Sequence, residues 1–171
     1  MVRSFVCALI LIPAIVAHAA PIPHSQHTVS AKQTLAITVL AEDDACAWNR
    51  CLRDWRAMSW VLAKRWRMRV RTRKKETFED TAKLFSSVWK VSSKRARELR
   101  ALRFGEPSRG RWGSRWSMAQ EFVNHWFEGR VPDPCPRALN WGGKMDTPQG
   151  SWEPIKCGDT RNIFWAITNN D

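Results

Sequence analysis

Residues 35–42 read Leu-Ala-Ile-Thr-Val-Leu-Ala-Glu, an apolar run that ends in a carboxylate with two further acidic residues directly behind it. The run suits a helix and Ser30 is a suitable N-cap, so we expect a buried helix over residues 31–42. A carboxyl group at the end of such a helix can be desolvated enough to keep its proton near neutral pH, as a general acid must. Glu42 is therefore the candidate catalytic acid; the alternative interpretation is a solvated helix end.

The first twenty residues have the pattern of a secretory signal peptide. Arg3 supplies a short positive segment, residues 5–16 are apolar, and Ala17-His18-Ala19 fits the small-x-small cleavage pattern. The apolar run is too short for a comfortable membrane span, so we expect cleavage after Ala19 or Ala20 and no stable membrane anchor in the mature protein. The predicted location is secreted or periplasmic.

The remaining chain is predicted to hold one tail and one domain. Residues 21–30 contain proline without any periodicity and are expected to be a flexible tail. Residues 31–171 then suit a single domain, long enough to bury a core without a metal. Phosphate-binding glycine loops, zinc-binding His-Glu-x-x-His helices and Gly-x-Ser-x-Gly turns do not occur in the sequence, and we expect a monomer with no cofactor and no metal site.

Removing the signal peptide leaves four cysteines, an even number that suits disulfide bonds in an oxidising compartment: Cys46, Cys51, Cys135 and Cys157. Three pairings are possible. We favour Cys46 with Cys51 and Cys135 with Cys157, because the members of each pair are close in sequence. A four-cysteine zinc site is the alternative, but the spacing lacks the C-x₂-C pairs typical of one.

The chain is strongly basic, with 28 Lys and Arg against 16 Asp and Glu and a formal net charge of +12. Such a surface attracts polyanions. Basic residues are concentrated in residues 64–75 and again in residues 93–115. Either stretch can be a solvated helix end and loop or a dedicated binding patch, and the sequence favours neither interpretation.

The sequence holds 11 tryptophans and no tyrosine. We expect some of these rings in the core and others along a groove, because flat amphipathic rings suit sugar faces, bases and lipid interfaces. Trp112 and Trp141 each adjoin a glycine and are the predicted exposed, substrate-binding rings.

Helical patterns dominate the chain as far as residue 130. After the first helix, further helices are expected over residues 54–69, 78–89, 93–104 and 121–127. Residues 77–80 and 117–120 resemble capping boxes ahead of the second and the last of these, Ser93 can cap the third, and Gly129 is expected to end the last. Residues 46–51 are expected to form a turn and residues 108–115 a mobile loop. Proline and glycine then interrupt every pattern, so the fold class is predicted to be mainly α, a single helical domain with a loop-rich, short-strand C-terminal part.

Four segments in this order, Leu35–Glu42, Ala57–Arg65, Ala119–Val123 and Val131–Trp141, resemble a divergent cell-wall hydrolase of the spore-cortex-lytic type. The resemblance implies an α+β, lysozyme-like fold in which Glu42 is the catalytic acid. It also implies that the final segment places a short strand, including Asn140 and Trp141, beside the cleft. The chain departs from the family in lacking the second acidic residue that usually follows a basic and glycine pair.

The chemistry that this resemblance implies is glycosidic bond cleavage in peptidoglycan. Protonated Glu42 would donate to the glycosidic oxygen and then accept a proton, from water in a hydrolase or from the sugar C6 hydroxyl in a lytic transglycosylase. Asn140 would orient the substrate or a water and Trp141 would stack on a sugar ring; a turn residue and a core ring are the equally supported alternatives. The alternative function is a non-catalytic secreted cationic protein that binds anionic envelope polymers or nucleic acid.

Overall fold

The computed structural model describes residues 21–42, 48–104, 112–142, 148 and 150–168; the predicted signal peptide lies outside them. Within these residues the fold is mainly α, with a small C-terminal sheet, as predicted. The elements in chain order are η1 (His24–Gln26), α1 (Val29–Glu42), α2 (Trp48–Thr72), α3 (Phe78–Phe85), η2 (Ser87–Trp89), α4 (Lys94–Ala101), η3 (Leu102–Phe104), α5 (Gly113–Phe127), β1 (Asn140–Gly142), β2 (Trp152–Ile155) and β3 (Ile163–Ile167), where η denotes a 3₁₀ helix.

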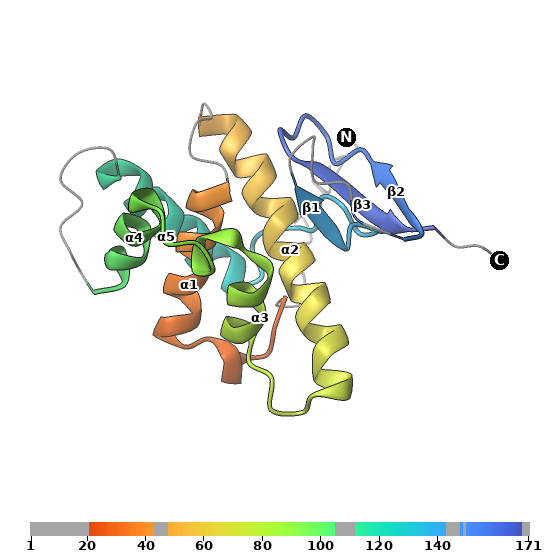
Figure 1. The fold of residues 1–171 in the computed structure, drawn as a ribbon, viewed down its shortest axis with the longest axis horizontal. Coiled ribbons are helices and arrows are strands. Elements are labelled where there is room, and N and C mark those ends of the chain that lie inside the picture. Colours follow the sequence, from red (N-terminus) through yellow and green to blue (C-terminus); the bar gives the residue numbers. More distant parts are fainter. Residues whose placement is uncertain (1–20, 43–47, 105–111, 143–147, 149, 169–171) are drawn as a thin grey trace, which may run out of the picture.

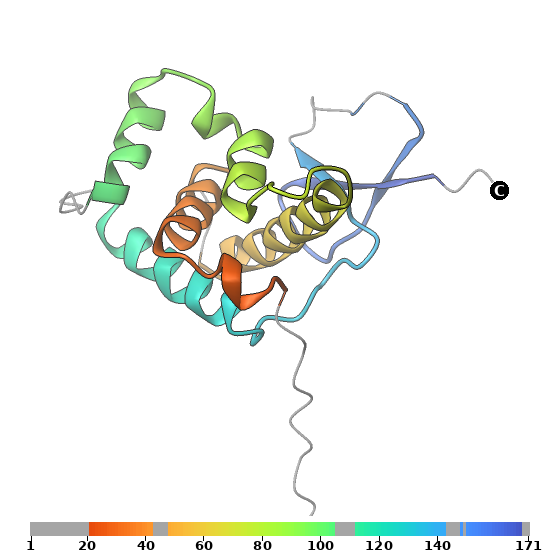
Figure 2. The same ribbon diagram turned by 90° about the horizontal axis from the view of Figure 1, so that it is seen from below.

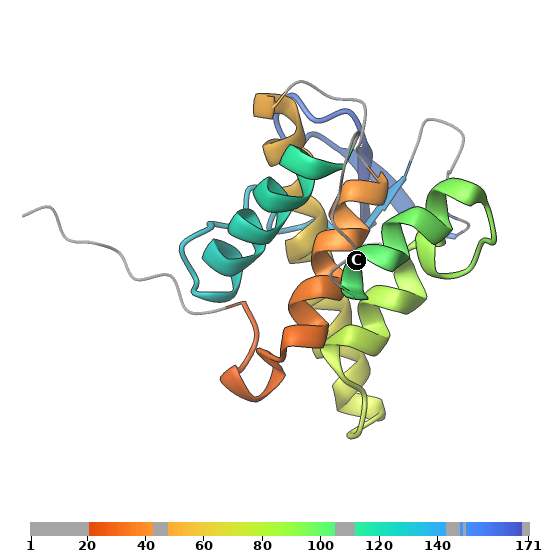
Figure 3. The ribbon, with the colours of Figure 1, turned by 90° about the vertical axis from the view of Figure 1, so that its left-hand side faces the viewer.

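Helix α1 is the centre of the helical part. All its residues from Thr34 to Leu40 are buried, because α1 contacts α2, α3, α4 and α5. Figures 2 and 3 show α1 between α5 on one side and α3 and α4 on the other. A helix enclosed on every side must be apolar all round, which is why the sequence of α1 shows no polar face.

The start of α1 differs from the prediction by two residues. The helix begins at Val29 because the Thr28 hydroxyl caps it, accepting from the backbone N–H of Ala31 at 3.0 Å. Ser30, the predicted cap, instead accepts a hydrogen bond from the Arg103 guanidinium at 2.9 Å.

The segment before α1 packs against the helical part and differs from the predicted flexible tail. Ile22 is only 1% exposed. The Gln26 side chain accepts a hydrogen bond from the backbone N–H of Phe78 at 2.9 Å, and the His27 ring lies 5.0 Å from the Phe127 ring in an edge-to-face contact. Apolar burial and these contacts order a segment that has no periodic pattern of its own.

Helix α2 is the longest element and lies between the helical part and the sheet (Figure 1). It begins at Trp48, so the turn predicted over residues 46–51 is wrong for its last four residues. Cys51, in the first turn of α2, is disulfide-bonded, while its predicted partner Cys46 lies outside the described residues.

The shorter helices follow the sequence patterns in part. The capping box of Thr77 and Asp80 and the Ser93 cap are confirmed at the starts of α3 and α4. Helix α5 begins at Gly113, so the capping box predicted at residues 117–120 is wrong: those residues lie inside the helix. Gly129, with a φ of 73°, ends this helix as predicted, because a left-handed residue there favours glycine.

Three antiparallel strands form the C-terminal sheet in the order β1-β3-β2. The central strand β3 buries Phe164, Trp165 and Ala166, while β1 contacts α2. The predicted disulfide between Cys135 and Cys157 is confirmed, with a Cα–Cα distance of 5.3 Å. It joins the segment before β1 to the loop after β2.

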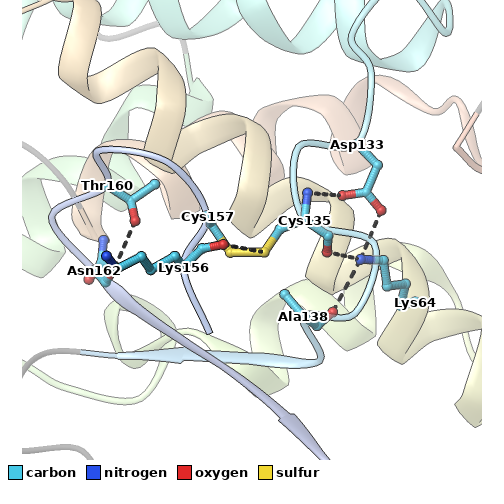
Figure 4. The surroundings of a disulfide bond; sticks show 8 residues. All are labelled: Lys64, Asp133, Cys135, Ala138, Lys156, Cys157, Thr160 and Asn162. Atoms are coloured by element: carbon cyan, nitrogen blue, oxygen red, sulfur yellow. Dashed lines mark hydrogen bonds and ion pairs between the residues drawn. A yellow bond between two sulfur atoms is a disulfide. The ribbon is translucent and has the colours of Figure 1, made fainter. Parts of the chain in front are cut away.

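Side chains of α2 hold the segment before β1 through its backbone carbonyls. Trp60 Nε1 donates to the carbonyl of Val131 at 3.0 Å. Lys64 Nζ donates to the carbonyls of Cys135 at 2.7 Å and Ala138 at 3.2 Å, beside the disulfide (Figure 4). We call residues 131–139 the anchored segment. Its position relative to α2 is therefore fixed at several points along its length.

Candidate functional site

Glu42, the predicted acid, is the last residue of α1 and is half-buried. Its Oε1 accepts a hydrogen bond from the Ser86 hydroxyl at 2.8 Å. Ser86 is fully buried and follows α3 in extended conformation, directly before η2. The carboxyl group is therefore held at the junction of three elements, α1, α3 and η2.

A second hydrogen bond one turn earlier along α1 fixes the same face. Trp89 Nε1 donates to the Thr38 hydroxyl at 3.1 Å. Thr38 and Glu42 are one α-helical turn apart, and Ser86 and Trp89 are one 3₁₀ turn apart, so the two bonds run side by side. Together they set the direction in which the Glu42 side chain leaves α1.

A small pocket of about 100 Å³ lies at the end of α1, and Glu42 is not among the residues that line it. Ala41 and Ser87, the neighbours of Glu42 and Ser86 in sequence, line one side of it, and Val91 and Leu99 are among the residues that line the rest. Arg95, a further lining residue, donates from Nη2 to the carbonyl of Ala41 at 2.7 Å. The pocket offers an apolar wall with hydroxyl and guanidinium groups, lined by the sequence neighbours of Glu42 and Ser86.

Arg65, on α2, lies where this helix meets α3 and the sheet. Its guanidinium carbon is 4.9 Å from the centre of the Phe85 ring and 5.2 Å from that of the Trp152 ring. Its Nε donates to the carbonyl of Leu139 at 2.5 Å. Burial lowers the pKa of Arg65, which nevertheless stays charged at neutral pH.

These contacts connect Glu42 to the predicted substrate-binding strand. Glu42 is bonded to Ser86, whose neighbour Phe85 stacks with Arg65, and Arg65 is bonded to Leu139, the residue before Asn140. Half-buried Asn140 is the first residue of β1 and pairs with Trp165 of β3. Glu42 and Asn140 are thus connected only through these intermediate residues, and no described hydrogen bond joins the two directly.

The two predicted sugar-stacking tryptophans lie in the core. Trp112 is 7% exposed and Trp141 is 8% exposed, and both belong to the main cluster of buried apolar side chains. Neither ring presents a free face for stacking on a sugar. A glycine neighbour is therefore a poor indicator of exposure, and the half-buried tryptophan bonded to α1 one turn before Glu42 is Trp89.

The basic run over residues 64–75 is divided between structural and exposed cations. Lys64 pairs with Asp133 at 2.8 Å and Arg69 pairs with Glu76 at 2.6 Å, while Arg67 donates to the carbonyl of Pro21. The exposed cations lie at its end: Arg71, Arg73, Lys74 and Lys75. Only this second half of the run is available as a binding patch.

The second basic stretch, residues 93–115, divides in a similar way. Arg100 donates to the carbonyls of Val88 and Val91, and Arg103 pairs with Glu79. Residues 108–111, half of the predicted mobile loop, lie outside the described part of the chain, and the prediction is wrong for residues 113–115, which begin α5.

Within the described residues, no group of three or more His, Cys, Asp and Glu side chains is arranged to hold a metal ion. In the same part of the chain no helix has both the length and the apolar character needed to cross a bilayer.

Sequence reasoning missed Ser86 and Arg65. Ser86 follows α3 and bonds to a residue 44 positions earlier, and Arg65 stands in a run of cations that looks uniform in sequence. No local signal marks either residue. No protein-family model matches the chain, and no curated protein or solved structure is significantly similar to it.

Proposed function

We propose that the protein is a secreted, lysozyme-like enzyme that cleaves the glycan strands of peptidoglycan, with Glu42 as general acid and base. The observation that supports the proposal is the position of this carboxyl group: it ends a helix that is buried from Thr34 to Leu40, is itself half-buried, and is held by the buried hydroxyl of Ser86. A general acid must be oriented and partly withdrawn from water, and Glu42 meets both conditions.

The contacts of Glu42 favour a mechanism with one carboxylate. Protonated Glu42 donates to the glycosidic oxygen as the bond from C1 to that oxygen breaks. The resulting carboxylate then takes the proton of the C6 hydroxyl, whose oxygen bonds to C1 and closes an anhydro ring. This lytic transglycosylase route needs no second acidic residue, and none is found among the described contacts of Glu42. In the hydrolase route, water takes the place of the C6 hydroxyl.

Export of the protein is part of the proposal. A disulfide between Cys135 and Cys157 persists in oxidising compartments, where peptidoglycan is also found. The signal-like sequence over residues 1–20 supports the same location.

The test compares the mature protein with its Glu42→Gln variant on isolated sacculi. The wild type should release soluble muropeptides, and mass spectrometry should find anhydro ends for a transglycosylase or reducing ends for a hydrolase. Because general acid–base catalysis contributes about 10²- to 10⁴-fold, Glu42→Gln should lose that factor in rate. Ser86→Ala, which removes only the positioning hydrogen bond, should lose less and keep substrate binding.

Glu121→Gln is the matched control, because Glu121 is an exposed glutamate on α5, remote in the fold from the α1–η2 junction. It should be as active as the wild type. Full activity of Glu42→Gln would refute the catalytic role of Glu42, and a wild type that releases nothing would refute the enzyme.

The alternative is a cationic protein that binds anionic envelope polymers or nucleic acid without cleaving them. The exposed cations at the end of α2, Arg71 to Lys75, favour it. Its binding would weaken steeply with salt because counterions are released on association, and it would not respond to Glu42→Gln.

A further inference from the structure

Among the cations at residues 64–69 of α2, Arg65 is half-buried without a carboxylate partner in the described part of the chain, whereas Arg67, which also has none, is exposed. Lys64 has Asp133, Arg69 has Glu76, and Arg67 has the carbonyl of Pro21. Arg65 Nε is bonded to the carbonyl of Leu139, whereas its two terminal nitrogens make no hydrogen bond within the described residues.

Such an arrangement is costly unless a ligand completes it. Withdrawing a guanidinium group from water without a counter-charge is unfavourable, and the rings of Phe85 and Trp152 compensate only in part. The same contacts hold the planar group in one orientation, with its two terminal nitrogens free to donate together. A carboxylate matches that pair of donors in geometry and in charge.

The position of Arg65 indicates which carboxylate this is. Phe85, which stacks with Arg65, is the neighbour of Ser86, which binds the candidate acid Glu42. Substrate bound at Glu42 would therefore extend past Arg65. In peptidoglycan, carboxylates occur on the muramic acid residues, as the stem peptide or as the lactyl group where the peptide has been removed.

We propose that Arg65 binds a carboxylate carried by the muramic acid residue of the substrate, and so selects peptidoglycan over neutral glycans. This inference rests on the proposed function for the identity of the substrate. It assigns Arg65 a binding role and leaves the chemical step to Glu42.

The experiment measures binding by calorimetry in the Glu42→Gln background, where no turnover occurs. The three probes are a murein tetrasaccharide with its stem peptides, the same compound with every stem carboxylate converted to a methylamide, and a peptide-free tetrasaccharide with free lactyl carboxylates. Hydrogen bonds to charged groups contribute about 1.5–3 kcal/mol, so the probe that carries the recognised carboxylate, either the first or the third, should bind about ten- to a hundredfold more tightly than the second. Tight binding of the third probe identifies the lactyl group as the source, and weak binding identifies the stem peptide.

Arg65→Gln should abolish the preference for the free carboxylate, and Arg65→Lys should reduce it because a lysine keeps the charge but not the paired donors. Arg56→Gln, which removes an exposed cation from the same helix, is the matched control and should keep the full preference. Melting temperatures of all variants show whether Arg65 is needed for folding.

Two results would overturn the proposal. The first is that, with Arg65 intact, neither the probe with stem carboxylates nor the probe with free lactyl carboxylates binds more tightly than the methylamidated probe. The second is an Arg65→Lys or folded Arg65→Gln variant that weakens the charged and methylamidated probes equally, which would indicate a purely structural role. Failure of the proposed function would be seen in a different experiment, in which the wild-type protein leaves isolated sacculi intact.

Discussion

Replacing Asp54 should destabilise the protein more than any change to a surface charge. Asp54 lies on α2 and is fully buried. Its Oδ2 accepts from the backbone N–H of Arg161 at 2.9 Å, and its Oδ1 accepts from the backbone N–H and the side-chain amide of Asn162 at 2.9 and 3.1 Å. One carboxylate thus joins α2 to the turn that leads into β3.

The size of the effect follows from the number of bonds lost. Asp54→Ala removes all three hydrogen bonds, and a hydrogen bond to a charged acceptor contributes about 1.5–3 kcal/mol. Water replaces part of this stabilisation at the half-exposed turn. We therefore expect a loss of about 4 kcal/mol in the free energy of unfolding. Asp54→Asn keeps one acceptor oxygen and turns an NH₂ group toward a backbone N–H. Its expected loss is about 2 kcal/mol.

Chemical denaturation monitored by tryptophan fluorescence measures both losses. The control is Asp159→Asn, which breaks the ion pair of Asp159 with Arg53; this pair also joins α2 to the loop before β3, but its side chains are 48% and 88% exposed. An exposed pair contributes about 0–1 kcal/mol. If Asp54→Asn proves no less stable than this control, the argument from buried hydrogen bonds is wrong.

Two further outcomes are expected. Replacing both Cys135 and Cys157 by serine should lower the free energy of unfolding by about 3 kcal/mol, because the disulfide closes a loop of 22 residues; an unchanged denaturation midpoint would contradict this. For Glu79, burial raises the pKa, but hydrogen bonds from Lys83 and Ser30 and the charges of Lys83 and Arg103 outweigh it and lower the pKa below 4.5. The ionised Glu79 side chain therefore stabilises the fold above pH 4.5, and this stabilisation is lost as the pH falls through the folded-state pKa. Glu79→Gln should make the free energy of unfolding depend less on pH between about pH 5 and pH 3, as measured by denaturation.

The sequence predicts helices better than it predicts where they begin. The apolar run of α1 and the capping box of α3 are local patterns, and both predictions were close to the structure. Helix α5 begins at Gly113 without a side-chain cap, and α2 begins six residues before the predicted Asp54. These starts are not marked by local signals, so packing against the rest of the fold must extend the helices beyond them.

Only the residue of the candidate site that a single segment of sequence marks could be predicted. Glu42 stands out because it ends an apolar helix, which a single segment of sequence shows. Ser86 and Arg65 reach it through contacts between distant segments, and such contacts have no local pattern. Trp112 and Trp141 were assigned to the surface from their glycine neighbours, but the core of this small domain takes both rings.

Apart from the ion pair of Lys64 with Asp133, the described attachments of α2 to the anchored segment do not depend on the side chains of that segment. Trp60, Lys64 and Arg65 all bind carbonyl groups, which every amino acid supplies. Substitutions at exposed positions of the segment, such as Pro136 and Arg137, therefore leave these attachments unchanged. Asn140 is the first residue after this segment. Mutations at the exposed positions can therefore change the side chains beside the candidate site while the backbone stays attached to α2. This makes the segment a suitable place to alter substrate preference by design.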